Sequence, residues 1–370
     1  MVTTSCKKEK ETPENTPSSP TAETCLSNTY CFTDDEGNNT VDYSGQTVRL
    51  NQLTELTAYL KTANTLGVSL SAEIIRDMFS NNSGAGSIHF SASAATLGKQ
   101  LEDKCFLPNL GYYYDLFDAI ETASQSQSPG SNGSAGVVVG IADPTKKYLL
   151  DANGREITQF IEKGLMGDIF YYQAMETYIT GVESGIFNYT DAIDPANGLY
   201  YTEAEHKFDE AFGYFGAPID YPINTSAARF IARYCVARDE ALECLDELFN
   251  AFIGARNAIS AGNQTEANTQ IALVREQWHR ITAGTALYYL KGSIANLDDP
   301  AIKCHNLSEG WAFIRNLAFN SPYALQQSQI EEIHAAIGSN FYETTENQIN
   351  EAIVLLLNYS GITLIEFADL

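Results

Sequence analysis

The sequence has few basic residues and no long apolar run. Lysine and arginine together number 22 in 370 residues, against 47 aspartates and glutamates, which gives a formal net charge of −25. Such a negative surface repels nucleic acid and anionic lipid, so we expect no nucleic-acid partner. No stretch of about 18 consecutive apolar residues occurs, so we expect no helix that crosses a membrane. The balance is typical of a folded domain outside the cytoplasm, or of one that attracts cations.

Several common catalytic signatures are also missing. The chain has no Walker loop, no GxGxxG fingerprint and no GxSxG nucleophile elbow. The zincin pattern HExxH is absent, because glutamate directly follows neither His206 nor His305. These absences favour a binding function over a catalytic one, although they leave the question of an enzyme open.

The first 30 residues have the composition of a tether. "TTSC" (3–6) resembles a loose lipobox, and "CKKEKE" (6–11) resembles the export signal after the lipidated cysteine of Bacteroidetes surface lipoproteins. Residues 7–24 are rich in Pro, Ser and Thr and contain too few apolar side chains to form a core. We expect an exported protein whose Cys6 carries lipid and anchors it in the outer membrane, facing the surface or the periplasm. The alternative is an unstructured tail with a stray cysteine.

The remaining cysteines number six, an even count that permits disulfides in an exported chain. Cys25 and Cys31 are near enough in sequence to close a small loop. Cys235 and Cys244 fall in one expected helix, where a separation of nine residues gives about 13 Å of rise, beyond the reach of a disulfide. We therefore expect those two not to pair with each other. The alternative for all six is that some are buried thiols.

Helical periodicity dominates the chain and predicts an all-α fold. Leu50, Leu53, Leu56 and Leu60 recur at helical spacing, and Ser71 is the expected N-cap of the next helix. From residue 156 onward the helices are long; 225–259 and 264–297 each read as a single one. A short hairpin is expected at Asn153-Gly154. The predicted units are a tail and tether at 1–30, an N-terminal helical and loop segment packed on the bundle at 31–155, and two bundle halves at 156–262 and 263–370.

Two motifs recur in the same order in these two halves. "GDIFYYQAM" (167–175) matches "GTALYYLKG" (284–292), each with a glycine and a Tyr-Tyr pair at the same offset. "HKFDEAFGYF" (206–215) matches "HNLSEGWAFI" (305–314). We therefore predict a duplicated antiparallel helical bundle whose halves are related by an approximate two-fold.

The same motifs carry a family resemblance that covers nearly the whole chain after the tail. Residues 41–65, 163–174, 205–216 and 305–314 resemble a family of uncharacterised Bacteroidetes lipoproteins, the one numbered 4856 among domains of unknown function. That family is similar to the imelysin-like group of exported, duplicated, all-helical proteins, which are linked to iron uptake and described as M75 peptidases. The imelysin signature GxHxxE falls on Ala204, His206 and Asp209, so two of its three positions are substituted here.

The histidines of the repeated motif are the candidate metal ligands. Residues four apart lie on one helix face, so His206 with Glu210 and His305 with Glu309 each bring an imidazole and a carboxylate together. These groups suit iron or zinc. The predicted metal ligands are His206, Asp209, Glu210, Glu203, His305 and Glu309. Further ligands are expected from Glu162, Asp168 or Glu176 on the preceding helix. The alternative is that the His–Glu pairs are hydrogen-bonded core contacts without a metal.

Three functions follow from these observations. The first is a lipoprotein that binds a metal or a metal-containing ligand in iron or metal acquisition, together with metal-uptake partner proteins. The second is an imelysin-type metallopeptidase in which His206 holds the metal and Glu210 or Asp209 acts as the base. The third is a surface lipoprotein that binds a partner and no small ligand.

Overall fold

The computed structural model describes residues 29–82 and 86–370. The fold is mainly α-helical, as predicted, with two small two-stranded sheets. Cys6 and Cys25 lie outside the described residues, so lipidation of Cys6 and the pairing of Cys25 stay predictions. Cys31 is disulfide-bonded. No helix of the described chain has the length and apolar character needed to cross a membrane.

The N-terminal segment begins with two helices that the sequence predicted well. All four leucines of the predicted periodic pattern are buried on α1. The Ser71 hydroxyl accepts a hydrogen bond from the backbone of Ile74 and so caps α2, as predicted. The helices here are α1 (Ser44–Lys61), α2 (Ala72–Ser80) and α3 (Leu110–Ser124), with 3₁₀ turns at Thr62–Asn64, Glu102–Lys104 and Leu107–Asn109.

The predicted hairpin exists at a different place. Strands β1 (Gly136–Val139) and β2 (Lys147–Leu150) pair antiparallel, with Gly136 opposite Leu150. Asn153-Gly154 lies beyond β2, in a turn where the Gly154 N–H donates to the Asp151 carbonyl. The hairpin prediction was therefore wrong in position, because this turn joins β2 to a helix and not to a second strand.

The middle of the chain forms one helical rod followed by a second small sheet. The rod contains α4 (Ile157–Leu165), two π-helical segments, η5 (Met166–Tyr171) and η6 (Gln173–Ile179), and α5 (Thr180–Ser184). Strands β3 (Ala192–Asp194) and β4 (Leu199–Thr202) then lead into α6 (Glu203–Phe215), with a 3₁₀ turn at Pro195–Asn197 between them. α6 packs back against η6.

The helix predicted over 225–259 is two helices. α7 (Phe230–Leu242) ends where Glu243 takes a left-handed conformation with φ of 48°, and α8 (Leu245–Ser260) begins after it. The Asp239 carboxylate accepts a hydrogen bond from the Leu245 N–H across the break. The break brings the Sγ atoms of Cys235 and Cys244 to 3.6 Å, so the predicted separation of these thiols was wrong.

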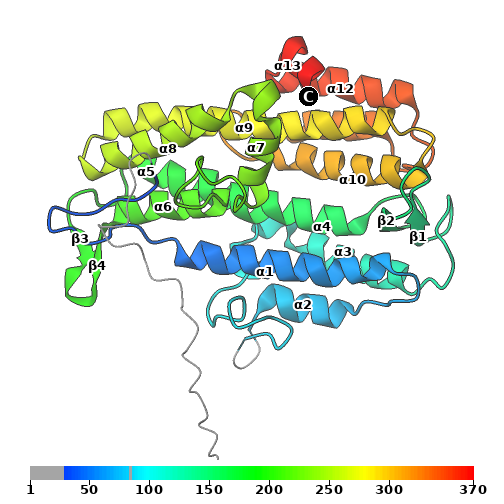
Figure 1. Ribbon diagram of the computed structural model, residues 1–370, viewed down its shortest axis with the longest axis horizontal. Helices are drawn as coiled ribbons and strands as arrows, with labels where there is room; N and C mark the ends of the chain where they lie inside the picture. Colours follow the sequence, from blue (N-terminus) through cyan, green and yellow to red (C-terminus); the bar gives the residue numbers. More distant parts are fainter. Residues whose placement is uncertain (1–28, 83–85) are drawn as a thin grey trace, which may run out of the picture.

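The C-terminal helices complete a layered arrangement. In Figure 1, α1 and α2 form one side, α4 and α6 lie in the middle, α8, α9 and α10 lie beyond them, and α12 and α13 form the other side. α7 stands across these layers. The last helices are α9 (Gln264–Ile294), α10 (Pro300–Asn316), α11 (Gln327–Ile337), α12 (Glu346–Ser360) and α13 (Leu364–Asp369).

The repeated motifs occupy similar positions but different environments. α6 packs on the segment that carries Tyr171, and α10 packs on α9, which carries Tyr288. Tyr171 is fully buried, whereas Tyr288 is 39% exposed and lies under the Arg238 guanidinium. The duplication and the two-fold relation of the halves both stay predictions.

We predict that a thiol–disulfide oxidant will link Cys235 to Cys244. Both thiols are fully buried and in contact, so rotation of the side chains is enough to form the bond, with the electrons passing to the oxidant. Peptide mapping under non-reducing conditions should find the linked peptides after slow oxidation. A loop this short should stabilise the fold by about 2–3 kcal/mol. If both thiols can still be alkylated after oxidation and unfolding, the prediction is wrong. Cys304 is the control, because no other cysteine contacts its thiol among the described residues.

Candidate functional site

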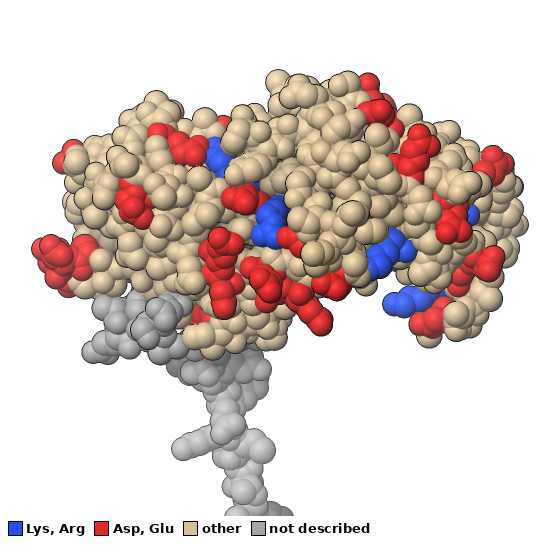
Figure 2. Space-filling view, turned by 90° about the horizontal axis from the view of Figure 1, so that it is seen from above, with Lys and Arg blue, Asp and Glu red and all other residues tan. Residues whose placement is uncertain are grey.

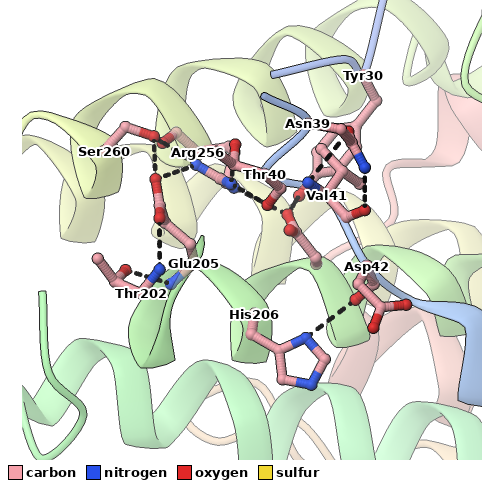
Figure 3. Close-up of polar contacts among 11 residues, drawn as sticks. Tyr30, Asn39, Thr40, Val41, Asp42, Thr202, Glu205, His206, Arg256 and Ser260 are labelled. Atoms are coloured by element: carbon pink, nitrogen blue, oxygen red, sulfur yellow. Dashed lines mark hydrogen bonds and ion pairs between the residues drawn. The ribbon is translucent and has the colours of Figure 1, made fainter. Parts of the chain in front are cut away.

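The predicted ligands on α6 are positioned by a capping box. The Thr202 hydroxyl accepts from the Glu205 N–H at 3.2 Å, and the Glu205 carboxylate accepts from the Thr202 N–H at 2.7 Å. This reciprocal pair fixes the start of α6. His206 follows directly and lies beside the N-terminal loop (Figure 3).

His206 makes contacts that are suited to packing. Its Nδ1 lies 3.1 Å from the carbonyl oxygen of Asp42 (Figure 3). Its ring stacks on Tyr201 with ring centroids 4.7 Å apart. Burial lowers the pKa of His206, against the opposing charge of Glu210. The imidazole therefore tends to be neutral at neutral pH and to pin α6 to the loop before α1.

Asp209 belongs to a buried ion cluster. Its Oδ1 accepts from the Tyr30 hydroxyl and from Nε of Arg256, each at 2.8 Å. The same guanidinium donates to Glu205 at 2.7 Å and to the Thr40 carbonyl at 2.8 Å (Figure 3). Burial raises the pKa of Asp209 to about 6, although Arg256 opposes the shift. Oδ1 of Asp209 is thus engaged by the protein itself, while its buried Oδ2 has no hydrogen-bond partner among the described residues.

The other two predicted carboxylates of this region turn to separate partners. Glu210 pairs with Lys207 at 2.6 Å and accepts from Gln46 at 2.9 Å. Glu203 accepts from the Asn188 N–H at 3.2 Å. In residues 29–82 and 86–370, no group of three or more His, Cys, Asp or Glu side chains is arranged to hold a metal ion. The metal prediction for the His206 region therefore gains no geometric support.

The second predicted pair lies in a different cluster about His305. Its Nδ1 is 2.6 Å from Glu156, and its Nε2 is 3.4 Å from Glu309. The ring stacks on Tyr148 of β2 with centroids 4.2 Å apart. Burial opposes the charged form, but the two carboxylates outweigh it and raise the pKa of His305. Nδ1 therefore lies at hydrogen-bonding distance from Glu156, and Nε2 has only a longer contact with Glu309.

Glu156 is the functional residue that the sequence analysis missed. It immediately precedes α4, and its N–H donates to the Ser308 hydroxyl of α10 at 2.9 Å. It is fully buried, 149 positions from its partner His305. Of the further ligands expected from the α4 rod, Glu162 does reach this cluster. Asp168 pairs with Arg315 and Glu176 accepts from Asn320, away from it.

These groups line a pocket of about 480 Å³, the central pocket, between α4, α7, α10 and the β1–β2 hairpin. Its acidic residues number three, and its basic residues, apart from His305, number six. The acidic residues are Glu156, Glu162 and Glu309, and the basic residues are Lys61, Lys146, Lys147, Lys163, Arg233 and Arg238. The pocket thus carries a formal charge of +3 before His305 is counted.

The pocket floor is formed by its buried charges, which alternate in sign. Lys163 lies 2.9 Å from Glu162 and 3.9 Å from Glu309, and Lys61 lies 3.0 Å from the other oxygen of Glu162. Burial opposes ionisation of Glu162, but Lys163 and Lys61 lower its pKa to about 2. Likewise, Glu162 and Glu309 overcome burial and raise the pKa of Lys163. Glu162 and Lys163 are therefore ionised and hold each other in place.

The rim is formed by four cations without acidic partners: Lys146 and Lys147 at the hairpin, and Arg233 and Arg238 on α7. None of the four forms an ion pair with a carboxylate within the described chain. Arg238 packs over Tyr288, with its guanidinium carbon 3.5 Å from the ring centroid, and its Nε is buried without a hydrogen-bond partner among the described residues. The rim thus offers positive charge without a close ion pair, although Glu162 and Asp143 act on Arg233 and Lys146 from a longer distance.

The chain belongs to the family described as Domain of unknown function (DUF4856). The family model matches residues 27–340, a range that contains the α6 cluster and the whole central pocket. No curated protein and no solved structure shows a significant match.

Replacing Arg256 should destabilise the fold strongly. Arg256→Met leaves Asp209 and Glu205 buried without their cation, which should cost about 3–5 kcal/mol of unfolding free energy. Urea denaturation measures this loss. The control is Arg76→Met, which removes an exposed pair with Asp118 and should cost less than about 1 kcal/mol. Similar losses for the two variants would argue against the anchoring role of Arg256.

The His305 cluster predicts a pH dependence. Folding raises the pKa of His305 above its usual value. The protonated side chain therefore contributes its full share to the free energy of unfolding below a pH of about 6.5, and this share is lost as the pH rises through the folded pKa. Histidine NMR should show His305 titrating above 6.5, and His279 and His334 titrating near 4 because of burial. Glu156→Gln should lower the pKa of His305 and leave those two unchanged. A His305 pKa that Glu156→Gln does not move would contradict the pairing.

Proposed function

We propose that this chain is an exported, lipid-anchored binding protein whose ligand is a small anion held in the central pocket. One observation carries the proposal, the reversal of charge between the molecule and the pocket. Over the whole chain acidic residues outnumber basic ones by 47 to 22, yet the pocket is lined by six of the basic residues and three of the acidic ones. Figure 2 shows one face of the acidic exterior, with acidic side chains scattered over it and few basic ones between them.

The position of the unpaired cations supports an anionic ligand. The surface carries many carboxylates, yet these cations beside the pocket form no ion pair with them. Their charge is therefore available to a bound anion. Lys146 and Lys147 approach from the hairpin, and Arg233 and Arg238 approach from α7, so a ligand is flanked by positive charge from two elements. A cleft with walls of low dielectric focuses such a field and strengthens the attraction.

The same charges restrict the form in which a metal could bind in this pocket. A bare metal cation meets four unpaired cations at the rim, whereas a negatively charged chelate meets attraction. The six basic residues of the lining outnumber its three carboxylates, so we infer that the ligand of this site is an anion, with or without a metal inside it. The lipid anchor rests on the sequence about Cys6.

The geometry supports binding over the imelysin-type peptidase alternative. Asp209 would have to serve as a base or a ligand, but it already accepts from Arg256 and Tyr30. Ala204, which replaces the glycine of the signature, is fully buried. Any relation to imelysin-like proteins therefore concerns the fold and the export of the chain more than peptide hydrolysis.

The test is anion binding measured by calorimetry at low ionic strength, with succinate and inorganic phosphate as probes. Binding of at least one probe should weaken about tenfold in a Lys146→Gln/Lys147→Gln variant, which corresponds to about 1.4 kcal/mol. Added salt should weaken it too, because it screens exposed charges.

The control variant is Arg76→Gln/Lys207→Gln, which removes the same charge from outside the pocket. It should bind as the wild type does. The proposal fails if neither probe binds, or if the two double variants lose affinity equally.

A further inference from the structure

One carboxylate on the pocket floor is held more loosely than the others. Glu156 lies 2.6 Å from His305, and Glu162 lies 2.9 and 3.0 Å from two lysines. The contacts of Glu309 measure 3.4 Å to His305, 3.5 Å to the Tyr234 hydroxyl and 3.9 Å to Lys163, and the Tyr289 hydroxyl is a further hydrogen-bonding neighbour. Charge-assisted hydrogen bonds in proteins are normally about 2.7–2.9 Å long. The measured contacts of Glu309 are all longer than this range, which leaves its carboxylate capacity to accept a shorter hydrogen bond.

This capacity faces the pocket. The Glu309 residue is only 5% exposed, so bulk water does not readily supply the missing donors, yet it lines the central pocket. An ionised carboxylate has about four acceptor positions, and a buried one gains free energy when a donor fills them. From these contacts we propose that the ligand is a small hydroxy acid, whose anionic group lies among the rim cations and whose hydroxyl donates to Glu309. The inference rests on the anion-binding function proposed above.

The neighbours of Glu309 decide which donor suits it. Lys163 and protonated His305 both lie beside its carboxylate, so a ligand ammonium would approach two cations. A hydroxyl donates its hydrogen bond without adding charge and avoids that repulsion. A neutral donor is therefore favoured over an amino group at this position.

The size of the pocket is compatible with such a molecule. About 480 Å³ lies within the range of roughly 300–1,000 Å³ that is typical of small-molecule sites. A site that pairs a ligand hydroxyl with a buried group discriminates against the analogue without the hydroxyl, because the buried group is then left unpaired. The hydroxyl should therefore contribute to selectivity as well as to affinity.

Three four-carbon diacids test whether the ligand group beside Glu309 is a hydroxyl, an ammonium or neither. Their binding is measured by calorimetry at neutral pH and low ionic strength. Succinate has the two carboxylates alone, racemic malate adds a hydroxyl, and aspartate adds an ammonium. Malate should bind about tenfold more tightly than succinate, equivalent to about 1.4 kcal/mol, and aspartate should bind no more tightly than succinate. In Glu309→Gln the preference for malate should fall to about threefold or less, because a neutral amide accepts more weakly than a carboxylate.

Glu332→Gln is the control, since it removes one carboxylate from the exposed surface near Tyr359 and should keep the full preference for malate. Thermal unfolding should show that Glu309→Gln remains folded. Equal binding of malate and succinate by the wild type, or a preference that survives in Glu309→Gln, overturns the hydroxyl assignment. Tighter binding of aspartate than of malate overturns it in favour of an amine. If no diacid and no phosphate binds, the anion-binding function itself is refuted.

Discussion

The Arg256 guanidinium joins the N-terminal segment to the bundle. From α8 it reaches the carboxylates of Asp209 and Glu205 on α6 and the carbonyl of Thr40 in the loop before α1. α1 follows that loop and ends at Lys61, which lies on Glu162 in the central pocket. A contact at one end of the molecule therefore helps to set the position of a charged side chain in the pocket.

Buried charges in this protein come with partners. Asp209 has Arg256, Glu162 has two lysines and Glu156 has His305, because an isolated charge in the interior is too costly to keep. The rim of the central pocket is different, because Lys146, Lys147 and Arg233 are exposed to solvent and form no ion pair with a carboxylate within the described chain. The cost of burial explains the charge pairs of the floor, and the solvated rim cations are the ones that the proposed anion would contact.

The features that could be predicted from the sequence are those that local helical periodicity determines. The all-α class, the cap at Ser71 and the helix over 264–297 follow from patterns within one or two turns. The break at Glu243 was missed because its neighbours are good helix formers and tertiary packing overrode them. The pairing of His305 with Glu156 was missed for a different reason, since 149 positions separate the two and only the packing of α10 on α4 brings them together. The placement of His and Glu on common helix faces was predictable, and the cation-rich pocket was not.

A chain with a net charge of −25 can still bind an anion because screening makes the interaction local. At physiological ionic strength the field of an exposed charge decays over about 8 Å, so carboxylates on distant faces contribute little inside the pocket. A ligand there responds to the positive lining and the partly engaged Glu309, and hardly to the total charge. The acidic exterior meanwhile repels polyanions that would otherwise compete for the same cations. With the proposed function, the surface would exclude large anions and the pocket would select a small one.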